Sequence, residues 1–291
     1  MDQVGLLFLA VFSLSLLAGR LAPVHVSRTA GRLLQPVVVA LIFTISMWAG
    51  SSISGLGNIL ALLGYSMAYS TLSIALSYLS GMLIGGFRSR AVRPINYRAP
   101  ITYAAPLLVG WFVGMLARVN PPGLAIDAEL YTLALLVGLA TGPSLSLGSI
   151  MEGGRVGLLA SVSSIIGSAA AGLALSRILG VRLGASLAIA LGMGWYTYTG
   201  PTVALYEGPM LGAVAFLANF MREQLTFIIV PMMPGNPESL ISIGGATSMD
   251  DTLPVYISAL GYEYMAASVS SGLLLTILVP FMVQSALLIG R

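Results

Sequence analysis

The stretch Gly244-Gly245-Ala246-Thr247-Ser248-Met249-Asp250-Asp251-Thr252-Leu253-Pro254 places two adjacent carboxylates among small and hydroxylated residues in a strongly apolar chain. A charged side chain at bilayer depth costs about 2.5 to 3.5 kcal/mol, so it is read as functional by default. The glycines at its start and the proline at its end interrupt a helix, and the backbone groups that they free must line an enclosed or wet cavity. The stretch therefore predicts a polar site at a break in a membrane helix.

The rest of the chain has the composition of an integral membrane protein. Of its 291 residues, 57% are hydrophobic and only 8% are charged, and the mean hydropathy is +0.94. The absence of Cys excludes disulfides, thiol catalysis and thiolate metal sites. All 13 basic residues are Arg, and most lie in short loops between apolar segments, which indicates control of membrane topology rather than binding of nucleic acid.

Apolar segments long enough to cross ~30 Å of hydrocarbon, which takes ~20 residues, recur along the chain. Two further apolar segments, 184–206 and 239–260, are broken, the first at Gly194 to Pro201 and the second at the stretch above. Each either crosses as a broken helix or re-enters as a hairpin. We expect an all-α integral membrane protein with about eight transmembrane helices plus two broken or re-entrant hairpins, with inverted repeats. The clear spans are about 4–20, 33–53, 58–86, 101–118, 130–150, 156–177, 208–231 and 264–289.

A weak internal repeat marks the first part of the chain. Leu17 to Pro23 resembles Leu116 to Pro121, and in both an Arg ends an apolar span. Because each copy has three spans, the second copy must be inverted in the membrane. Residues 1–182 are therefore predicted to form two inverted three-helix repeats that act as a scaffold or in dimerisation.

A clearer repeat marks the second part. Ile228 to Met233 resembles Ile277 to Met282, and each closes a helix that follows a broken segment. Residues 183–291 are therefore predicted to form two hairpin-plus-helix units that build the transport site. If the units are inverted, the hairpin tips meet near the middle of the membrane.

The arginines also predict an orientation. Arg20, Arg28 and Arg32 in the first loop lie on the same side as the four arginines of 88–98, whereas the loop between them is uncharged. The positive-inside rule then places the N-terminus outside, and either model of the broken segments places the C-terminus outside too. The first apolar run carries no basic segment before it and no convincing cleavage site after it, so we expect a retained helix in the cell (plasma or inner) membrane.

The span before the second break carries three polar residues. Asn219 and Glu223 are four residues apart and share a helix face, whereas Arg222 points about a quarter-turn aside. We expect Glu223 to face the cavity. The alternative is that Arg222 and Glu223 are structural, either paired with other helices or reaching an interface by snorkelling.

Asp250 and Asp251 allow two interpretations. In the functional one, one carboxylate binds a cationic group or a proton, and the other caps a short helix that begins near Thr252 to Pro254. In the structural one, both are caps in a solvated loop. Adjacent like charges raise the pKa of one carboxyl, which suits a proton carrier.

In the first break, Thr199-Gly200-Pro201 predicts a cap, a flexible joint and a helix start. The positive end of that half-helix is a candidate seat for a carboxylate. Trp195, Tyr196 and Tyr198 would wall the cavity and offer a ring face to a cation. An interfacial aromatic belt explains these three rings equally well.

These residues resemble motifs of the LysO family of membrane lysine exporters. The resemblance rests on Gly192 to Tyr196, Gly208-Pro209, Asn219 with Arg222-Glu223, and above all Gly245 to Asp250 followed by Thr252-Leu253-Pro254, so it covers roughly residues 190–256. It implies export of L-lysine and toxic analogues from the cytoplasm, eight spans with both termini outside, and dependence on two intramembrane acids. Matched to the motifs, those acids are Glu223 and Asp250. No family role falls on Asp251.

The sequence and the resemblance together predict a secondary exporter of L-lysine that exchanges it for protons, with Na⁺ left open as the coupling ion. Glu223 and Asp250 would bind the lysine ammonium, and Asn219, Thr247 and Ser248 would complete its hydrogen bonds. The half-helix near Gly200 would take the substrate carboxylate. No phosphate-binding loop of the Walker type is present, so ATP does not drive transport within this chain.

Three alternatives stay open. The first is a cation-coupled transporter of another organic ion or amino acid, with Arg222 as an anion clamp. The second is an intramembrane hydrolase, although Glu223 and Asp250 only loosely fit an acid dyad. The third, a passive channel, ranks last because the two breaks are unlike each other. We therefore expect no enzyme and no cofactor, with L-lysine and the lipid bilayer as partners, no nucleic acid, and homodimerisation left open.

Overall fold

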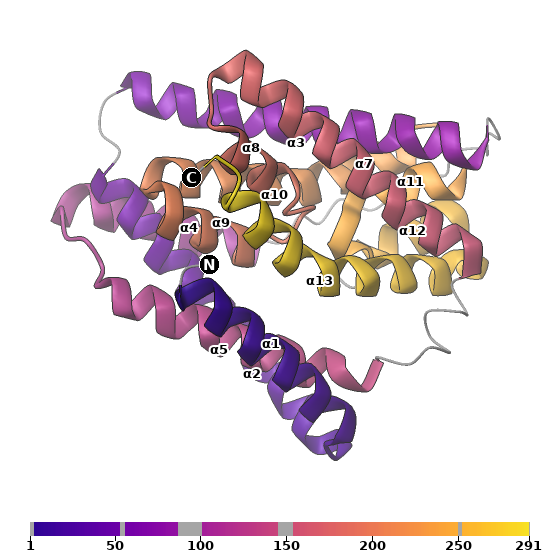
Figure 1. Cartoon of the computed structure of the whole chain (residues 1–291), viewed down its shortest axis with the longest axis horizontal. Helices are drawn as coiled ribbons and strands as arrows, with labels where there is room; N and C mark the ends of the chain where they lie inside the picture. Colours follow the sequence, from indigo (N-terminus) through magenta and orange to yellow (C-terminus); the bar gives the residue numbers. More distant parts are fainter. Residues whose placement is uncertain (1–2, 53–55, 87–100, 145–153, 250–251, 291) are drawn as a thin grey trace. The chain divides into compact units, whose positions relative to one another are not determined.

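The computed structural model (Figure 1) describes residues 3–52, 56–86, 101–144, 154–249 and 252–290. Helices make up 89% of the structure, and its described residues contain no strand, which confirms the predicted all-α class. The chain forms two compact units that interleave along the sequence. Unit 1 comprises Met1–Leu62, Pro100–Ser146 and Thr197–Phe216, and unit 2 comprises Leu63–Ala99, Leu147–Tyr196 and Leu217–Arg291.

Unit 1 is built mainly on two helix pairs. Helix α1 (Gln3–Leu21) packs along α5 (Gly123–Thr141), which continues into the short 3₁₀ helix η1 (Gly142–Ser144), and α2 (Val24–Ser52) packs along α4 (Ile101–Ala117). Helix α2 also contacts α5. A buried cluster in this unit joins α2 and α5 to α9 (Tyr196–Glu207) through Leu41, Ile45, Ile126, Leu133 and Ala204.

Glycines set how closely these pairs approach. A Cβ on Gly110 or Gly114 of α4 would collide with the backbone of α2, and one on Gly19 of α1 would lie 2.7 Å from the carbonyl oxygen of Leu139 in α5. Backbones that approach this closely gain van der Waals contact, which is the main source of helix association where lipid surrounds the helices. Small residues at the crossings therefore hold unit 1 together.

Unit 2 has two long helices, α3 (Leu56–Gly85, of which the part from Leu63 belongs here) and α7 (Gly154–Leu179), which meet where Gly167 packs against Ser77. The short helix α8 (Leu183–Ala190) packs on α7 and on α13 (Met265–Leu287). The remaining elements of this unit are most of α10 (Pro209–Met232), α11 (Pro237–Gly244), the 3₁₀ helix η2 (Gly245–Met249), α12 (Leu253–Leu260) and the 3₁₀ helix η3 (Tyr262–Tyr264).

The apolar core of unit 2 surrounds α11 and α12. Helix α11 begins at Pro237, and the side chain of the preceding Asn236 caps it by accepting a hydrogen bond from the amide of Ser239 at 2.7 Å. The Nδ2 atom of Asn236 also donates to the carbonyl oxygens of Gly81 and Gly86 at the end of α3, at 3.2 and 2.6 Å. The core cluster consists of Ile74, Ala160, Val230, Leu240, Ile241, Ile243, Val255, Tyr256, Leu260 and Ala267.

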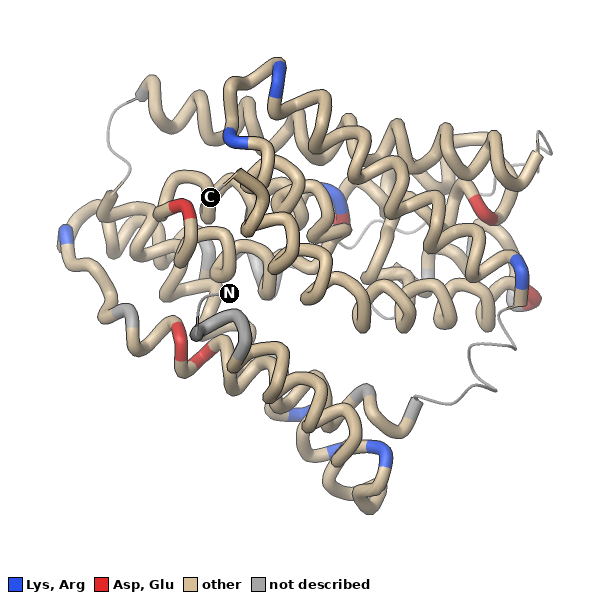
Figure 2. Tube along the Cα trace, viewed as in Figure 1, with Lys and Arg blue, Asp and Glu red and all other residues tan. Residues whose placement is uncertain are grey.

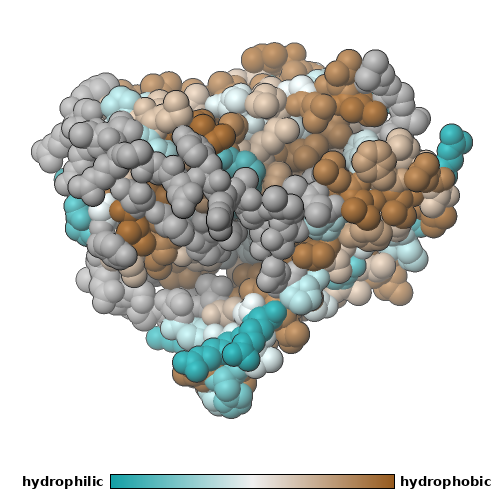
Figure 3. All heavy atoms as spheres, turned by 180° about the vertical axis from the view of Figure 1, so that it is seen from behind, coloured by the Kyte–Doolittle hydropathy of each residue, from teal (hydrophilic) through white to brown (hydrophobic). Residues whose placement is uncertain are grey.

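Within the described part of the chain, five helices are long and apolar enough to cross a membrane: α2, α3 from Gly57, α7, α10 and α13. Apolar residues cover much of the face shown in Figure 3, and hydrophilic ones gather at the exposed end where α1 meets α2. Charged residues lie mostly toward helix ends in Figure 2, but one basic and one acidic neighbour occur together inside α10. The chain is therefore a multi-pass membrane protein.

Two predicted spans have the wrong boundaries. Helix α2 begins at Val24 rather than near residue 33, so Arg28 and Arg32 are helical and not in a loop. Both arginines lie on an exposed part of the helix, where a long charged side chain does not need a loop to reach polar surroundings. Because the first turns of α2 are polar, hydropathy did not predict that they belong to the helix.

The predicted span 130–150 also begins too late. Helix α5 begins at Gly123 and ends at Thr141, so it includes Asp127 and Glu129, which the prediction left outside. Thr44 of α2 donates a hydrogen bond of 2.9 Å to Oε1 of Glu129. This partner on a neighbouring helix allows an acid to lie within the packed helix pair.

Candidate functional site

Helix α10 carries the three polar residues that the sequence singled out, and all three are buried. Asn219 is 2% exposed, Arg222 1% and Glu223 0%. They lie near the middle of an apolar helix of 24 residues, and Asn219 lies about one turn before Arg222, on the same side. Burial of a cation, an anion and an amide on one membrane helix marks this turn of α10 as the centre of the candidate site.

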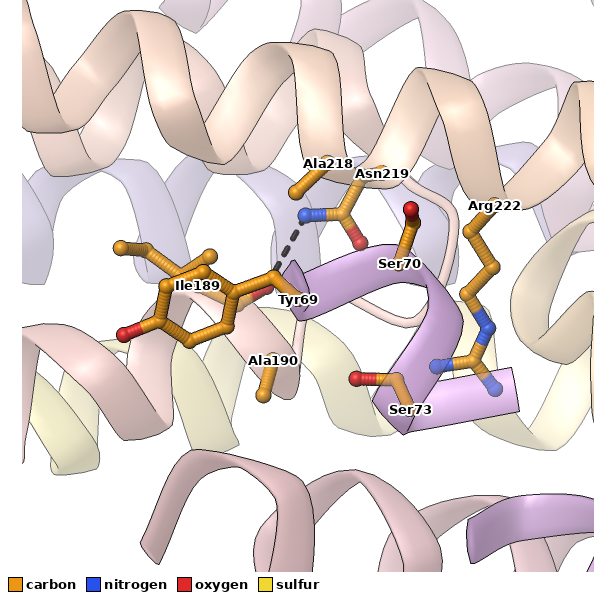
Figure 4. A pocket seen from close by; sticks show the side chains of 8 residues that line it. All are labelled: Tyr69, Ser70, Ser73, Ile189, Ala190, Ala218, Asn219 and Arg222. Atoms are coloured by element: carbon orange, nitrogen blue, oxygen red, sulfur yellow. Dashed lines mark hydrogen bonds between the residues drawn. The ribbon is translucent and has the colours of Figure 1, made fainter. Parts of the chain in front are cut away.

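The first break lies between α8 and α9, and Asn219 closes it. Helix α8 ends at Ala190, and Met193 and Gly194 reverse the chain with positive φ angles of 45° and 93°. Oδ1 of Asn219 accepts a hydrogen bond of 2.8 Å from the amide of Gly194. Its Nδ2 donates at 2.9 Å to the carbonyl oxygen of Ile189, as Figure 4 shows. One neutral side chain therefore satisfies a backbone carbonyl before the break and a backbone amide within it.

The second break lies between α11 and α12, and Arg222 holds the end of α11. Nε of Arg222 donates to the carbonyl oxygen of Ile243 at 2.8 Å, and Nη2 donates to that of Ser242 at 3.0 Å. Helix α11 ends one residue later, at Gly244, and Gly245 follows with a φ of 66°. The guanidinium thus satisfies carbonyls that a helix end leaves without intrahelical partners.

Three buried serines complete the surroundings of the guanidinium. Nη1 of Arg222 donates to Oγ of Ser168 at 2.8 Å, and Nη2 donates to Oγ of Ser164 at 3.0 Å and to Oγ of Ser77 at 3.2 Å. Ser77 lies on α3, and the other two lie on α7. Among the described residues, every hydrogen-bond acceptor of Arg222 is a neutral oxygen.

The two breaks touch each other. The amide of Ala246 donates a hydrogen bond of 2.9 Å to the carbonyl oxygen of Met193. A Cβ on Gly245 would collide with that same carbonyl, and a Cβ on Gly194 would lie 2.9 Å from the carbonyl oxygen of Gly244. Glycine is required here by both backbone conformation and close approach. The two breaks are thus in contact, whereas their being tips of re-entrant hairpins, their membrane depth and the faces from which they enter stay predictions.

A narrow crevice lies beside Asn219 and Arg222 (Figure 4). Its empty volume is about 160 Å³, and it is too narrow to admit a water molecule. An amino acid cannot enter it in this conformation, so binding would require α3, α8 or α10 to move. The lining residues are Tyr69, Ser70 and Ser73 of α3, Ile189 and Ala190 of α8, and Ala218, Asn219 and Arg222 of α10.

The hydroxyls of the second break bond to the backbone. Thr247 donates to the carbonyl oxygen of Gly244 at 3.1 Å, and Ser248 donates to those of Gly245 at 2.8 Å and Ser268 at 3.0 Å. These bonds shape η2 and attach it to α13. Their predicted role as ligands of an ammonium group stays a prediction.

Glu223, which follows Arg222 on α10, is fully buried. Its Oε1 accepts a hydrogen bond of 3.1 Å from Nε2 of the next residue, Gln224. Asp250 and Asp251, the other predicted acids, lie outside the described residues. Thr252 holds the N-cap position of α12, and the predicted capping role of an aspartate falls on residues outside the described part of the chain, so it stays a prediction. The predicted helix start near Thr252 to Pro254 is confirmed, because α12 begins at Leu253.

The predicted helix start at Thr199-Gly200-Pro201 is wrong by about one turn. Helix α9 begins at Tyr196, so Pro201 lies inside it. A Cβ on Gly200 would lie 2.8 Å from Cβ of Phe216, which shows that the glycine serves close packing of α9 against the start of α10. The glycine and proline therefore belong to a packed helix and do not mark its beginning.

The aromatic rings predicted to line the cavity at the first break pack against different residues. Tyr198 is 0% exposed, and its ring lies 4.5 Å from that of Phe8 in α1. The Tyr196 ring meets Phe220 of α10 edge-on at 5.4 Å. Trp195 is only half-buried. The predicted role of these rings as cavity walls stays a prediction.

The buried serines of α3 and Tyr69 were not among the site residues predicted from the sequence. Ser66, Ser70, Ser73 and Ser77 recur at intervals of three and four along α3, and all are at most 2% exposed. This is the spacing of one helix face, so a search for polar residues at helical period would have found them. Within the described chain, no cluster of three His, Cys, Asp or Glu residues could hold a metal ion.

Buried polar residues at two touching helix breaks in a multi-pass membrane protein are a feature that many transporters share. Residues 104–287, more than half of the chain, match the family model "Lysine exporter LysO", so the chain belongs to the LysO family. This confirms the predicted resemblance and extends it well beyond residues 190–256.

Two relatives agree with the family match. "Lysine exporter LysO" of Escherichia coli (strain K12) is 26% identical over 296 residues, which cover 96% of this chain and 97% of the relative. "Putative lysine exporter" of Haemophilus influenzae is 30% identical over 158 residues, or 53% of this chain and 79% of the relative. No solved structure matches the chain. The likeness to the Escherichia coli protein spans both halves of the chain.

Proposed function

We propose that this protein exports L-lysine and its analogues from the cytoplasm as a secondary active transporter, in exchange for protons. The observation that carries the proposal is Glu223, an acid with 0% exposure on an apolar helix, next to the residue whose guanidinium holds the second break. The lysine-exporter names of both relatives support the substrate. An acid in such a place is suited to bind a cation in one state and a proton in the other.

In the proposed cycle, Glu223 and Asp250 are ionised when the site faces the cytoplasm and pair with the lysine ammonium. Protonation from the outside removes this charge pairing and releases lysine. Asn219, Thr247 and Ser248 would add hydrogen bonds after the crevice opens. Because α9 begins at Tyr196, its first turn is the better candidate seat for the substrate carboxylate.

Helix contacts support the proposal that the first six spans are two inverted repeats. Under a two-fold axis, a contact between the first helix of one copy and the second helix of the other must be matched by the reciprocal contact. The contacts α1 with α5 and α4 with α2 are such a pair, and α2 with α5 joins equivalent helices, all within unit 1. The third helices of the two copies, α3 and α7, meet each other within unit 2.

The contacts of α10 and α13 support two hairpin-plus-helix units in the same way. When Pro231 is aligned with Pro280, Asn219 falls on Ser268. Asn219 bonds to Gly194 in the first break, and the carbonyl of Ser268 accepts the hydrogen bond of Ser248 in the second. Each long helix thus holds the break that precedes it at an equivalent position, as expected for eight spans with two re-entrant hairpins and both termini outside.

The experiment that tests the substrate is counterflow of labelled L-lysine in proteoliposomes. We expect wild-type protein to exchange lysine, and Glu223→Gln or Asp250→Asn to lose the exchange because the ammonium loses its partner. Glu263→Gln, at an exposed acid in η3, is the matched control and should exchange at the wild-type rate. Exchange that survives in the combined Glu223→Gln, Asp250→Asn protein would refute the assignment.

The proposed alternative, a transporter of another organic ion with Arg222 as anion clamp, has less support from the contacts. Nε, Nη1 and Nη2 of Arg222 already donate to oxygens of the protein, so an anion would have to displace them. Arginine, ornithine and an organic anion in the same counterflow assay separate the two proposals. Exchange of the anion but not of lysine would favour the alternative.

A further inference from the structure

The surroundings of Arg222 resemble a site for a bound metal cation more than a site for an anion. Two carbonyl oxygens, those of Ser242 and Ile243, and three serine hydroxyl oxygens lie 2.8 to 3.2 Å from the guanidinium nitrogens. The residues involved are at most 1% exposed. Each of these oxygens presents a lone pair to the same buried volume.

The source of the carbonyls strengthens this likeness. Ser242 and Ile243 are the last residues before α11 ends at Gly244, so their carbonyls carry the negative end of the helix dipole. Broken helices of secondary transporters commonly use such carbonyl ends, together with other oxygens, to coordinate Na⁺. Hard cations prefer oxygen ligands, and carbonyl and hydroxyl oxygens can supply them without a formal charge.

Arg222 joins three elements at this point. Its guanidinium contacts α3 through Ser77, α7 through Ser164 and Ser168, and α11 through its last carbonyls. Tyr256 of α12 closes the same end of α11 by accepting from the amide of Gly244 at 3.0 Å. A positive charge at this junction therefore holds the second break against the two long helices of unit 2.

We propose that the Arg222 guanidinium is a built-in cation that occupies the position of a coupling Na⁺, so that the transporter needs no Na⁺, and that its removal creates a Na⁺ site. The ligands of that site would be Oγ of Ser77, Ser164 and Ser168 and the carbonyl oxygens of Ser242 and Ile243. Lysine and protons are then the only cations that exchange during the cycle. Arg222 is a positioning residue in this scheme, because it holds the break and does not touch the substrate.

The inference about coupling rests on the proposed function, so its first test uses lysine counterflow in Na⁺-free medium. Wild type should exchange lysine equally in choline chloride and in NaCl. Arg222→Lys keeps a positive charge with three donors and should retain exchange, whereas the neutral Arg222→Gln should lose it by about tenfold or more in choline chloride, where no Na⁺ can replace the charge. Equal exchange by the Lys and Gln variants would overturn the need for a built-in cation.

The second test measures the vacated site without any lysine. Purified Arg222→Ala should bind ²²Na⁺, and wild type and Arg222→Lys should not. Ser168→Ala added to Arg222→Ala removes one ligand and should weaken this binding by about tenfold. Folded Arg222→Ala that binds no ²²Na⁺ would overturn the assignment of the site.

Folding itself gives a readout if Arg222→Ala is unstable. The proposal predicts that this variant is recovered folded when it is purified in NaCl and not in choline chloride, because Na⁺ replaces the lost charge. Recovery in neither salt contradicts the proposal. If wild type moves no lysine but Arg222→Ala binds ²²Na⁺, the lysine function fails while the cation site stands, so the two failures are distinguishable.

Discussion

Each of the two breaks of unit 2 leaves backbone groups without helical hydrogen bonds, and a different type of side chain satisfies them at each break. In the first break, the side-chain amide of Asn219 donates to the backbone carbonyl of Ile189 before the turn. It accepts from the backbone amide of Gly194 within the turn. In the second, Nε and Nη2 of Arg222 donate to the carbonyls of Ile243 and Ser242, and Nη1 and Nη2 also donate to three serine hydroxyls. Both clamps come from α10, one turn apart.

The difference is one of charge. A side-chain amide has both a donor and an acceptor, so Asn219 satisfies a carbonyl before the break and an amide within it without net charge. A guanidinium only donates hydrogen bonds. Arg222 can therefore satisfy carbonyl oxygens but not backbone amides, and it brings a positive charge into the protein. The second break therefore has to be built around a cation, and it is also the break whose following residues are the aspartates of the defining stretch.

Loss of the charged clamp should have the largest effect on stability. Arg222→Leu leaves two carbonyls at the end of α11 without a partner, and we expect the free energy of unfolding to fall by about 3 to 5 kcal/mol. Thermal unfolding in detergent without Na⁺ measures it. The same substitution at the exposed Arg177, at the end of α7, should change stability by less than about 0.5 kcal/mol. Equal effects at both positions would mean that the buried contacts contribute nothing.

A side chain at the contact between the breaks should have the next largest effect. In Gly245→Ala the Cβ collides with the carbonyl of Met193 at a residue with φ of 66°, so we expect a loss of about 2 to 3 kcal/mol. Gly64→Ala is the control, because a Cβ there meets nothing within 4 Å. This helical change should raise stability by up to about 1 kcal/mol. A tolerated Gly245→Ala would show that the breaks do not touch.

The neutral clamp should matter less than the charged one. Asn219→Leu leaves the amide of Gly194 and the carbonyl of Ile189 without this partner, and the expected loss is about 2 kcal/mol. Asn219→Asp tests the geometry further, because a carboxylate can accept from Gly194 but cannot donate to Ile189. A loss larger than that of Arg222→Leu would reverse the proposed ranking of the two clamps.

The smallest effect is expected from Ser248→Ala. The change removes hydrogen bonds to the carbonyls of Gly245 and Ser268 but keeps η2 in place, so we expect about 1 kcal/mol. The shift in the thermal midpoint should add to that of Asn219→Leu, because the two residues hold different breaks. Strong non-additivity in the double variant would show that the breaks are coupled more tightly than their contacts indicate.

The helices and the breaks could be predicted because they depend on local sequence. Apolar length identified α7, α10 and α13 to within a few residues, and the glycines around Gly244 located the end of α11. Asn219, Arg222 and Glu223 stood out because polar residues are rare at that depth. These signals belong to single segments, so they need no knowledge of tertiary contacts.

The partners of those residues could not be predicted because they come from other helices. Ser77 on α3 and Ser168 on α7 are far apart in sequence, and serine is too common to indicate a ligand of Arg222. The start of α9 was misplaced for a similar reason, because Gly200 and Pro201 have the local pattern of a helix start. The close contact of Gly200 with Phe216 decides the matter, and it is tertiary.

In the proposed mechanism, a buried acid beside the touching breaks couples lysine export to protons. Accumulation of labelled L-lysine in proteoliposomes, driven by an imposed pH gradient, tests this coupling with wild type and Glu223→Gln measured side by side. We expect gradient-driven lysine movement in wild type that is abolished in Glu223→Gln while the variant stays folded. Lysine movement that ignores the pH gradient, or that persists unchanged in Glu223→Gln, would contradict it.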